Sequence, residues 1–370
     1  MTDHRPSPNV VIDGFALSSA GAGSGVGTYT RHLLGALHRI RPGGLWALAT
    51  PEAPLPPGVE RLTVDRRARR ARLEVIEHAA RLPVDLARRR PSGAVFHNPG
   101  FHAPFGVRGP WVQTLLDVIP LVLDHRDLAA LRSRWKRFGP RYAKADAVIA
   151  ISAHAAAEGI RLLGLDPARV TIAPLGVDPS FTPGSGRADP PYVLMVGEYS
   201  RRKGFDRAFG VLDDLAERGY PHRLKVVGRV HDWGRAEVDA LRSAARHPER
   251  IELCGFVPDL VGLYQAASVV VVTSRYEGFG LPALEAMACG TPVVAFANSA
   301  VTEVVTDGGV LVADGDVAAM VTEVRRLIDD ERWADEWRQR GVERAATFTW
   351  ARSAAIHAEV YGQVAESSRP

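Results

Sequence analysis

Apolar and polar residues alternate between strand-like and helix-like patterns along the whole chain. The clearest stretch is residues 269–296. It opens with four consecutive valines, Val269–Val272, which suit a strand that is covered on both faces. A glycine-containing loop follows, and then a helical pattern with Pro282 at its first position and Gly290 just after its last. Residues 292–296 form a second apolar strand, so the stretch predicts one β-α-β unit.

Shorter apolar runs of the same kind recur in both halves of the chain. We expect further strands at residues 9–13, 93–97, 111–116, 147–151, 170–174, 192–197, 224–228 and 251–254. Strands that alternate with helical patterns predict parallel sheets. A chain of 370 residues has room for about two domains.

Composition is that of an ordinary globular protein, with a net charge of +4. Cys254 and Cys289 both fall in apolar segments, which favours buried thiols over a disulfide or a metal site. The N-terminal residues lack the apolar core of a signal peptide, and no apolar window is long enough to span a membrane. We therefore expect a cytoplasmic protein.

Positive charge is concentrated in residues 61–90. The arginines of this stretch are Arg66, Arg67, Arg69, Arg70, Arg72, Arg88, Arg89 and Arg90. Such a run is usually a solvated face, but it could also contact an anionic acceptor or anionic lipid at the inner face of a membrane. We do not predict nucleic-acid binding, because aromatic residues are not interleaved with the arginines.

Two glutamates give the 269–296 unit its candidate chemistry. Glu277 lies in the loop, and Glu285 lies in the first turns of the helix, where its side chain leans back toward the helix N-terminus. That end exposes unpaired N–H groups and the positive end of the helix dipole, which together suit a phosphate. Carboxylates accept hydrogen bonds from hydroxyls, so a sugar joined to a nucleotide diphosphate would fit. The alternative is a solvated helix cap and a loop salt bridge.

Weaker candidates lie in the first half. Glycines at positions 21, 23, 25 and 27 precede a helix expected at residues 28–40, but their spacing matches neither a dinucleotide fingerprint nor a P-loop. His97, Asn98 and Asp117 lie at the C-terminal ends of predicted strands, where open α/β sheets bind ligands.

Residues 132–144 form another predicted helix. Trp135, Phe138 and Tyr142 recur on it at helical spacing, which favours a core-facing stripe over a binding surface. Ser152 is a candidate N-cap for the helix after the 147–151 strand.

The segment SRYEGFGLPALEAMACGTPVVA resembles the donor-site signature of retaining nucleotide-sugar glycosyltransferases of family 4, in which seven residues separate the two glutamates, as here. The resemblance implies the α/β fold called GT-B: two Rossmann-like parallel-sheet domains facing a cleft, with a C-terminal helix that crosses back to the first domain. It implies an acceptor-side domain at residues 1–180, a donor domain at 181–348 and a closing helix at 349–370, with the hinge near residues 178–186.

The resemblance also implies roles for individual residues. The expected catalytic residues are Lys203, Arg202, Glu277 and Asp117. The expected donor-binding residues are Gly25, Gly27, Gly197, Glu277, Gly278, Phe279, Gly280, Leu281 and Glu285. The expected acceptor-side residues are Tyr29, His97 and Asn98. The chain departs from the family at Leu116, where a donor-contacting histidine is usual, and at Glu198, where an arginine is usual.

The implied reaction is transfer of a hexose, with retention, from a nucleotide diphosphate sugar to an acceptor hydroxyl. GDP-mannose is favoured, with UDP- or dTDP-linked sugars next, and the product would belong to a glycan, a cell envelope or a glycosylated metabolite. In the family the departing phosphate takes the proton of the acceptor, and the protein stabilises the leaving group. We predict no metal and no other cofactor, because Lys203, an arginine and a helix N-terminus supply the positive charge. The alternatives are a nucleotide-sugar 2-epimerase of the same fold and a non-catalytic sugar-nucleotide binding protein.

Overall fold

The computed structural model describes residues 8–18, 24–65, 71–101, 103–125, 128–184, 186, 188–230 and 232–368. The chain forms two compact units. The first comprises Met1–Gly176 together with Thr349–Pro370, and the second comprises Val177–Phe348. Unit 2 is thus inserted between two parts of unit 1.

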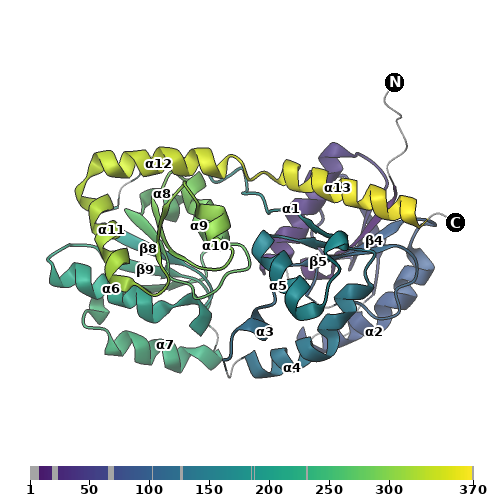
Figure 1. Ribbon diagram of the computed structural model, residues 1–370, viewed down its shortest axis with the longest axis horizontal. Coiled ribbons are helices and arrows are strands. Elements are labelled where there is room, and N and C mark those ends of the chain that lie inside the picture. Colours follow the sequence, from purple (N-terminus) through teal and green to yellow (C-terminus); the bar gives the residue numbers. More distant parts are fainter. Residues whose placement is uncertain are drawn as a thin grey trace. The chain divides into compact units, whose positions relative to one another are not determined.

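Unit 1 is built on a parallel sheet of seven strands in the order β3-β2-β1-β4-β5-β6-β7. The strands are β1 Val10–Asp13, β2 Leu45–Ala49, β3 Glu60–Thr63, β4 Val95–Asn98, β5 Trp111–Leu115, β6 Ala147–Ala150 and β7 Val170–Ile172. The helices are α1 Gly25–Ile40, α2 Ala71–Arg89, α3 Ile119–Val122, α4 Ala129–Phe138, α5 Ala153–Leu163 and α13 Trp350–Ser367. Figure 1 shows α13, the yellow helix, alongside α1, against which it packs.

Unit 2 is built on a second parallel sheet of six strands in the order β10-β9-β8-β11-β12-β13. The strands are β8 Tyr192–Val196, β9 Arg223–Val227, β10 Ile251–Gly255, β11 Val269–Val272, β12 Val293–Ala297 and β13 Val310–Ala313. The helices are α6 Phe205–Glu217, α7 Asp232–Ala244, α8 Val261–Ala266, α9 Leu281–Ala288, α10 Val301–Val305, α11 Val317–Asp329 and α12 Glu331–Ala345. Two Rossmann-like units confirm the predicted fold class.

The β-α-β unit at residues 269–296 is confirmed. All four valines of β11 are buried, and β11 pairs in parallel with both β8 and β12. Gly280 caps α9 with a φ of +114°, a conformation that favours glycine, and Pro282 occupies the first turn. The turn residues and the buried apolar run therefore favour the same strand–loop–helix structure.

The start of α1 differs from the prediction. We expected a helix from residue 28, but α1 begins at Gly25 because the side chain of Ser24 caps it, accepting a hydrogen bond from the Gly27 N–H at 3.1 Å. Gly25 and Gly27 are therefore helical residues and not part of a loop. The glycines at 21 and 23 lie outside the described residues.

Other predictions are confirmed or corrected in detail. The 132–144 helix is in fact α4 followed by a 3₁₀ helix at Gly139–Lys144, because Pro140 cannot continue the α-helical bonding. Of the predicted core stripe, Trp135 and Tyr142 are buried against each other, with ring centroids 5.4 Å apart, whereas Phe138 is only half-buried. Ser152 caps α5 as predicted. Cys289 is buried, whereas Cys254 is only half-buried.

Within the described part of the chain, no helix combines the length and the apolar character that a membrane crossing requires.

Candidate active site

A buried group of charges lies at the carboxyl ends of β8 and β11 in unit 2. Its centre is Glu277, which is 7% exposed. One carboxylate oxygen accepts hydrogen bonds from Lys203 Nζ at 2.6 Å and Ser274 Oγ at 2.6 Å. The other accepts from Arg202 Nη1 at 2.9 Å. We call Arg202, Lys203, Ser274 and Glu277 the Glu277 cluster.

The backbone around the Glu277 cluster explains how two cations reach one carboxylate. Arg202 and Lys203 belong to a 3₁₀ helix, Arg201–Lys203, that follows β8 and ends at Gly204 with a φ of +69°. A Cβ at Gly204 would lie 2.2 Å from the Thr273 carbonyl oxygen, so only glycine fits against β11 there. A Cβ at Gly197 would lie 3.0 Å from Lys203 Cε, so Gly197 leaves room for the lysine side chain.

The electrostatics of the Glu277 cluster favour the ionised carboxylate. Burial by itself would raise the pKa of Glu277, but the positive charges of Lys203 and Arg202 outweigh burial and lower that pKa to about 2. The backbone N–H of Glu277 also donates to Ser299 Oγ at 2.8 Å, which fixes the loop. The cluster therefore has two cations and one anion, an excess of positive charge.

Glu285 lies on α9 in a different environment. Its carboxylate accepts a hydrogen bond from Tyr264 Oη at 2.8 Å, and burial raises its pKa to about 7. Lys203 opposes this rise through its charge. Glu285 can thus be neutral or ionised near pH 7, whereas Glu277 is always ionised there.

Four more predicted donor-binding residues lie between these two glutamates, whereas Gly25 and Gly27 lie at the start of α1 in unit 1. Gly278, Phe279, Gly280 and Leu281 lead into the N-terminus of α9. The Phe279 ring is buried and packs edge-to-face on Phe348, with centroids 5.9 Å apart. The side chain of Phe279 thus contributes to the core of unit 2.

The three predicted acceptor-side residues lie inside unit 1, with their polar groups already in use. Tyr29 is 1% exposed, His97 is 0% exposed and Asn98 is 3% exposed. Asn98 donates to Gln113 Oε1 at 2.9 Å and accepts from the Gly100 N–H at 3.1 Å. In this structure these side chains make internal polar contacts: His97 and Asn98 lie at the buried end of β4, and Tyr29 lies on the buried face of α1.

Tyr29 and His97 belong to one buried chain of hydrogen bonds that ties α13 to the sheet. Tyr361 Oη lies 2.7 Å from His97 Nδ1, and His97 Nε2 lies 2.7 Å from Thr114 Oγ1. Thr114 Oγ1 lies 3.0 Å from Tyr29 Oη, which lies 2.8 Å from His357 Nε2. We call Tyr29, His97, Thr114, His357 and Tyr361 the α13 network.

One carbonyl sets the direction of every hydrogen bond in the α13 network. His357 Nδ1 lies 2.7 Å from the Ser353 carbonyl oxygen, which can only accept, so Nδ1 carries the proton. Nε2 of the neutral ring must then accept from Tyr29, which accepts from Thr114. Thr114 in turn accepts from His97 Nε2, and His97 Nδ1 accepts from Tyr361. Burial lowers the pKa of His357 to about 4 and that of His97 well below its usual value, so both rings stay neutral.

Asp117, the last predicted catalytic residue, lies just after β5 in unit 1. Its carboxylate accepts a hydrogen bond from the Ile119 N–H at 3.0 Å at the start of α3. Leu116, where the family usually has a histidine, is buried at 7% exposure, and Glu198 is exposed.

Several residues in or beside the two groups were not predicted. Ser274 begins the donor-site signature, but nothing in the signature indicated its contact with Glu277, and Ser299 and Tyr264 carry no motif that sequence reading could use. His357 and Tyr361 did carry a signal, since residues four apart share one face of a helix. Among the described residues, no set of three or more histidine, cysteine, aspartate or glutamate side chains is placed to hold a metal ion.

Two family models match adjoining parts of the chain. "Glycosyltransferase Family 4" matches residues 23–181, and "Glycosyl transferases group 1" matches residues 181–344. The D-inositol 3-phosphate glycosyltransferase of Mycolicibacterium gilvum is 30% identical over 312 residues, which cover 74% of this chain and 69% of the relative.

Other relatives match over shorter stretches. D-inositol 3-phosphate glycosyltransferase 2 of Catenulispora acidiphila is 36% identical over 246 residues, 61% of this chain, and the match spans only 58% of that relative's length. The GDP-mannose-dependent alpha-(1-6)-phosphatidylinositol dimannoside mannosyltransferase of Mycobacterium tuberculosis is 35% identical over 188 residues, 49% of this chain and 47% of the relative.

Among solved structures, the sucrose-phosphate synthase of Thermosynechococcus elongatus has the same fold. The TM-score is 0.76 at 22% identity, and the alignment covers 98% of this chain and all of that one.

Proposed function

Because the chain belongs to the group 1 glycosyltransferases of family 4, we propose that it transfers a hexose from a nucleotide diphosphate sugar to an acceptor hydroxyl, with retention. The observation that supports this best is the Glu277 cluster. A diphosphate leaving group gains negative charge as its bond to the sugar breaks, and Lys203 and Arg202 are already held in place to stabilise that charge.

In the proposed step the bond between the anomeric carbon and the phosphate oxygen breaks, and a bond to the acceptor oxygen forms on the same face. The acceptor proton moves to the departing phosphate. Glu277 is a positioning residue in this account, because its carboxylate holds both cations through hydrogen bonds of 2.6 and 2.9 Å. Preorganised charge of this kind needs no rearrangement during the reaction.

Glu285 and the N-terminus of α9 are proposed to hold the rest of the donor. The first amides of a helix suit a phosphate, and the Glu285 carboxylate can accept hydrogen bonds from sugar hydroxyls while it also accepts one from Tyr264. No metal is required in this proposal, because the positive charge comes from side chains and from the helix.

The favoured donor is GDP-mannose. The name of the Mycobacterium tuberculosis relative specifies GDP-mannose, which supports this choice. The acceptor is proposed to be a hydroxyl of a glycan, cell-envelope or metabolite precursor, and the relatives named for inositol 3-phosphate make a phosphorylated polyol a good first candidate.

We also propose that unit 1 makes a peripheral, salt-sensitive contact with an anionic membrane at the cytoplasmic face. On α2, Ile76 and Val84 are exposed at 63% and 48%, and Arg88 near its end is exposed too. Apolar side chains beside arginines suit such a surface. Arg90 does not take part, because its guanidinium donates to the carbonyls of Ala94, Arg108 and Pro110. Arg66, Arg67, Arg69 and Arg70 lie outside the described residues, as does the side chain of Arg72.

Nucleotide binding tests the proposed donor site directly. Melting temperatures of the full chain would be measured with GDP, UDP and dTDP, because a ligand at 100 times its Kd adds about 2.7 kcal/mol to the stability of the folded state. We expect GDP to give the largest rise and Lys203→Ala to remove most of it. If no nucleotide raises the melting temperature, or if Lys203→Ala responds like the wild type, the donor site is not where we place it.

A further inference from the structure

One face of α1 carries positive charge that the proposed reaction does not use. Arg31, Gly35 and Arg39 follow one another at intervals of four residues, so they share one face of the helix, and His32 lies beside them. The whole helix contains no aspartate or glutamate. Arg39 is exposed and Arg31 is half-buried.

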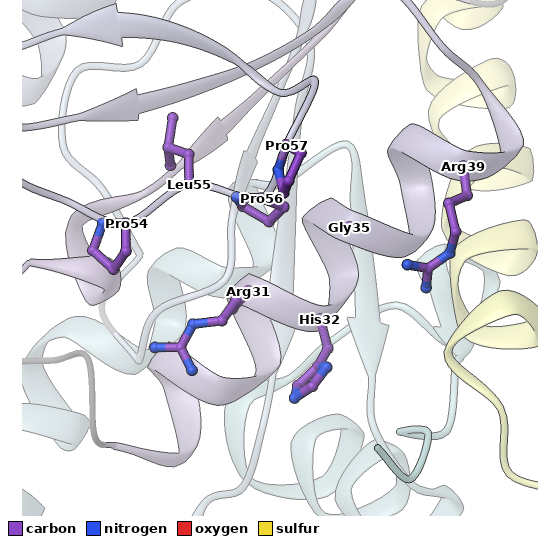
Figure 2. A pocket seen from close by; sticks show the side chains of 8 residues that line it. All are labelled: Arg31, His32, Gly35, Arg39, Pro54, Leu55, Pro56 and Pro57. Carbon is purple, nitrogen blue, oxygen red and sulfur yellow. The ribbon is translucent and has the colours of Figure 1, made fainter. Parts of the chain in front are cut away.

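This face borders a hollow of about 370 Å³ in unit 1 (Figure 2). The hollow is lined by Arg31, His32, Gly35, Arg39, Pro54, Leu55, Pro56 and Pro57. The lining combines cationic groups from α1 with apolar side chains from the β2–β3 connection, and it includes no acid. Its volume falls within the range of small-molecule sites.

Gly35 is the residue that leaves space between the two arginines. A Cβ there would meet Pro56 Cβ at 3.7 Å, which is ordinary contact, so packing does not require glycine. Glycine is also among the poorest residues for a helix interior, and alanine is the best. Neither local conformation nor packing therefore requires glycine at position 35. A ligand in the hollow would explain it, because a larger side chain at this position would take up part of the ligand's space.

The position of His32 is fixed independently of any ligand. Its ring stacks on Trp350 of α13, with centroids 5.1 Å apart and planes 13° from parallel. One wall of the hollow is thus held by the same helix that the α13 network anchors to the sheet.

We infer that this hollow binds the phosphate group of a small phosphorylated compound. The planar guanidinium groups of Arg31 and Arg39 present several N–H donors each, a geometry that matches phosphate oxygens. Leu55 and Pro56 would contact the carbon part of the ligand. The phosphate could belong to a free compound or to a lipid headgroup, since both present the same group. None of the residues that line the hollow belongs to the Glu277 cluster, so the inference does not depend on the proposed transfer reaction.

Direct binding to the full chain tests the inference. Isothermal titration at low ionic strength would use inorganic phosphate and glucose 6-phosphate as probes, with glucose as the uncharged control. We expect saturable binding of both phosphates, tighter for glucose 6-phosphate, and none of glucose. Binding should weaken as salt is added, because the arginines are partly exposed.

Three variants distinguish the hollow from other basic surfaces. Arg39→Gln should weaken binding about tenfold, because a hydrogen bond to a charged group is lost. Gly35→Leu should remove binding by filling the hollow while keeping every charge. Arg134→Gln, which removes an exposed arginine from α4 in the same unit, should bind like the wild type. Gly35→Ala serves as the folding control, and its melting temperature should not fall.

Vesicles of phosphatidylcholine with phosphatidic acid identify the source of the phosphate. Binding of the free compounds but not of vesicles through this face indicates a soluble ligand; vesicle binding that Gly35→Leu weakens indicates a headgroup. The inference is overturned if none of the three phosphate probes binds saturably. It is equally overturned if Arg39→Gln and a folded Gly35→Leu both bind as tightly as the wild type.

Discussion

The Glu277 cluster of unit 2 and the α13 network of unit 1 are both buried and polar, but they differ in charge. The Glu277 cluster contains one carboxylate, which accepts hydrogen bonds from two cationic side chains at 2.6 and 2.9 Å. The α13 network contains three hydroxyls and two imidazoles, and burial keeps both imidazoles neutral.

The difference follows from what each group of residues has to do. A neutral chain of hydrogen bonds can be fully satisfied inside the protein, so it can hold α13 without a large desolvation cost. Buried ions are costly to bring together and rarely improve stability over apolar packing. The excess of positive charge in the Glu277 cluster is therefore better explained by a negatively charged ligand than by a role in stability. This comparison leads to four predictions.

The largest effect is expected for Lys203→Ala. Loss of a fixed positive charge beside the leaving group should lower kcat/KM by at least about 100-fold, or about 3 kcal/mol of barrier. Circular dichroism should show a folded protein. Lys225→Ala is the matched control, because Lys225 is only loosely paired with Glu252, at 3.9 Å, and should leave the rate unchanged. A folded Lys203→Ala enzyme with a wild-type rate would remove the charge-stabilisation account.

Opposite responses to pH should separate the two units. Burial lowers the His357 pKa from 6.5 to about 4, so its contribution to the stability of unit 1 is complete above pH 6.5 and is lost as pH falls toward 4. Burial raises the Glu285 pKa from 4.5 to about 7, so its contribution to unit 2 is complete below pH 4.5 and is lost as pH rises through 7.

The expected sizes are about 3 kcal/mol for His357 and about 2 kcal/mol for Glu285, which is partly exposed to water. Amide hydrogen exchange read by mass spectrometry, corrected for intrinsic rates, measures each unit within the full chain. His357→Gln should reduce the loss of stability at acid pH in unit 1 alone, where His97 keeps its own contribution, and Glu285→Gln should reduce the loss near neutral pH in unit 2 alone. The same pH slope in both units, or slopes unchanged by these variants, would contradict the assignment.

A smaller effect is expected for Tyr361→Phe. Removing this hydroxyl leaves His97 Nδ1 as a buried acceptor without a donor, which should cost about 1–3 kcal/mol of unfolding free energy. Urea denaturation would measure it, with Tyr220→Phe as the control because that hydroxyl bonds to an exposed aspartate, Asp329. GDP binding should not change. Equal stability of Tyr361→Phe and wild type would show that the α13 network does not hold the helix.

The smallest effect is expected for Ser274→Ala. It removes one of the three side-chain donors to Glu277 and leaves both cations in place, so kcat/KM should fall by no more than about tenfold. Steady-state kinetics would test this beside Lys203→Ala. A loss as large as that of Lys203→Ala would mean that the serine itself contacts the donor.

Sequence reading predicted the centre of unit 2 well for a physical reason. In residues 269–296 the β-branched run, the proline at the helix start and the glycine after its end all indicate the same local structure. It did not predict β2, β3 or β13. β3 is a half-exposed edge strand with the sequence ERLT, so it carries little apolar pattern, but β2 (LWALA) and β13 (VLVA) are apolar runs as long as strands that were predicted. It missed the start of α1 because Ser24 follows a glycine-rich stretch that reads as a turn.

The candidate site was predictable only in part. Lys203, Arg202 and Glu277 were named from sequence, and the structure brings them together. Tyr29 and His97 were expected to face an acceptor, but they face α13. Tyr361, one of the two partners of His97, lies 264 residues further along the chain, and no local pattern around His97 indicates that a helix from there will cover it.

The insertion of unit 2 into unit 1 has a consequence for biosynthesis. The sheet of unit 1 leaves the ribosome first, but α13 follows only after the whole of Val177–Phe348. At 5–20 residues per second that interval is on the order of ten to thirty seconds. Throughout it the nascent chain exposes Tyr29, Thr114 and His97 with their helix missing, so the first-made part of this protein is the last to be completed. During that time it is a natural client for chaperones.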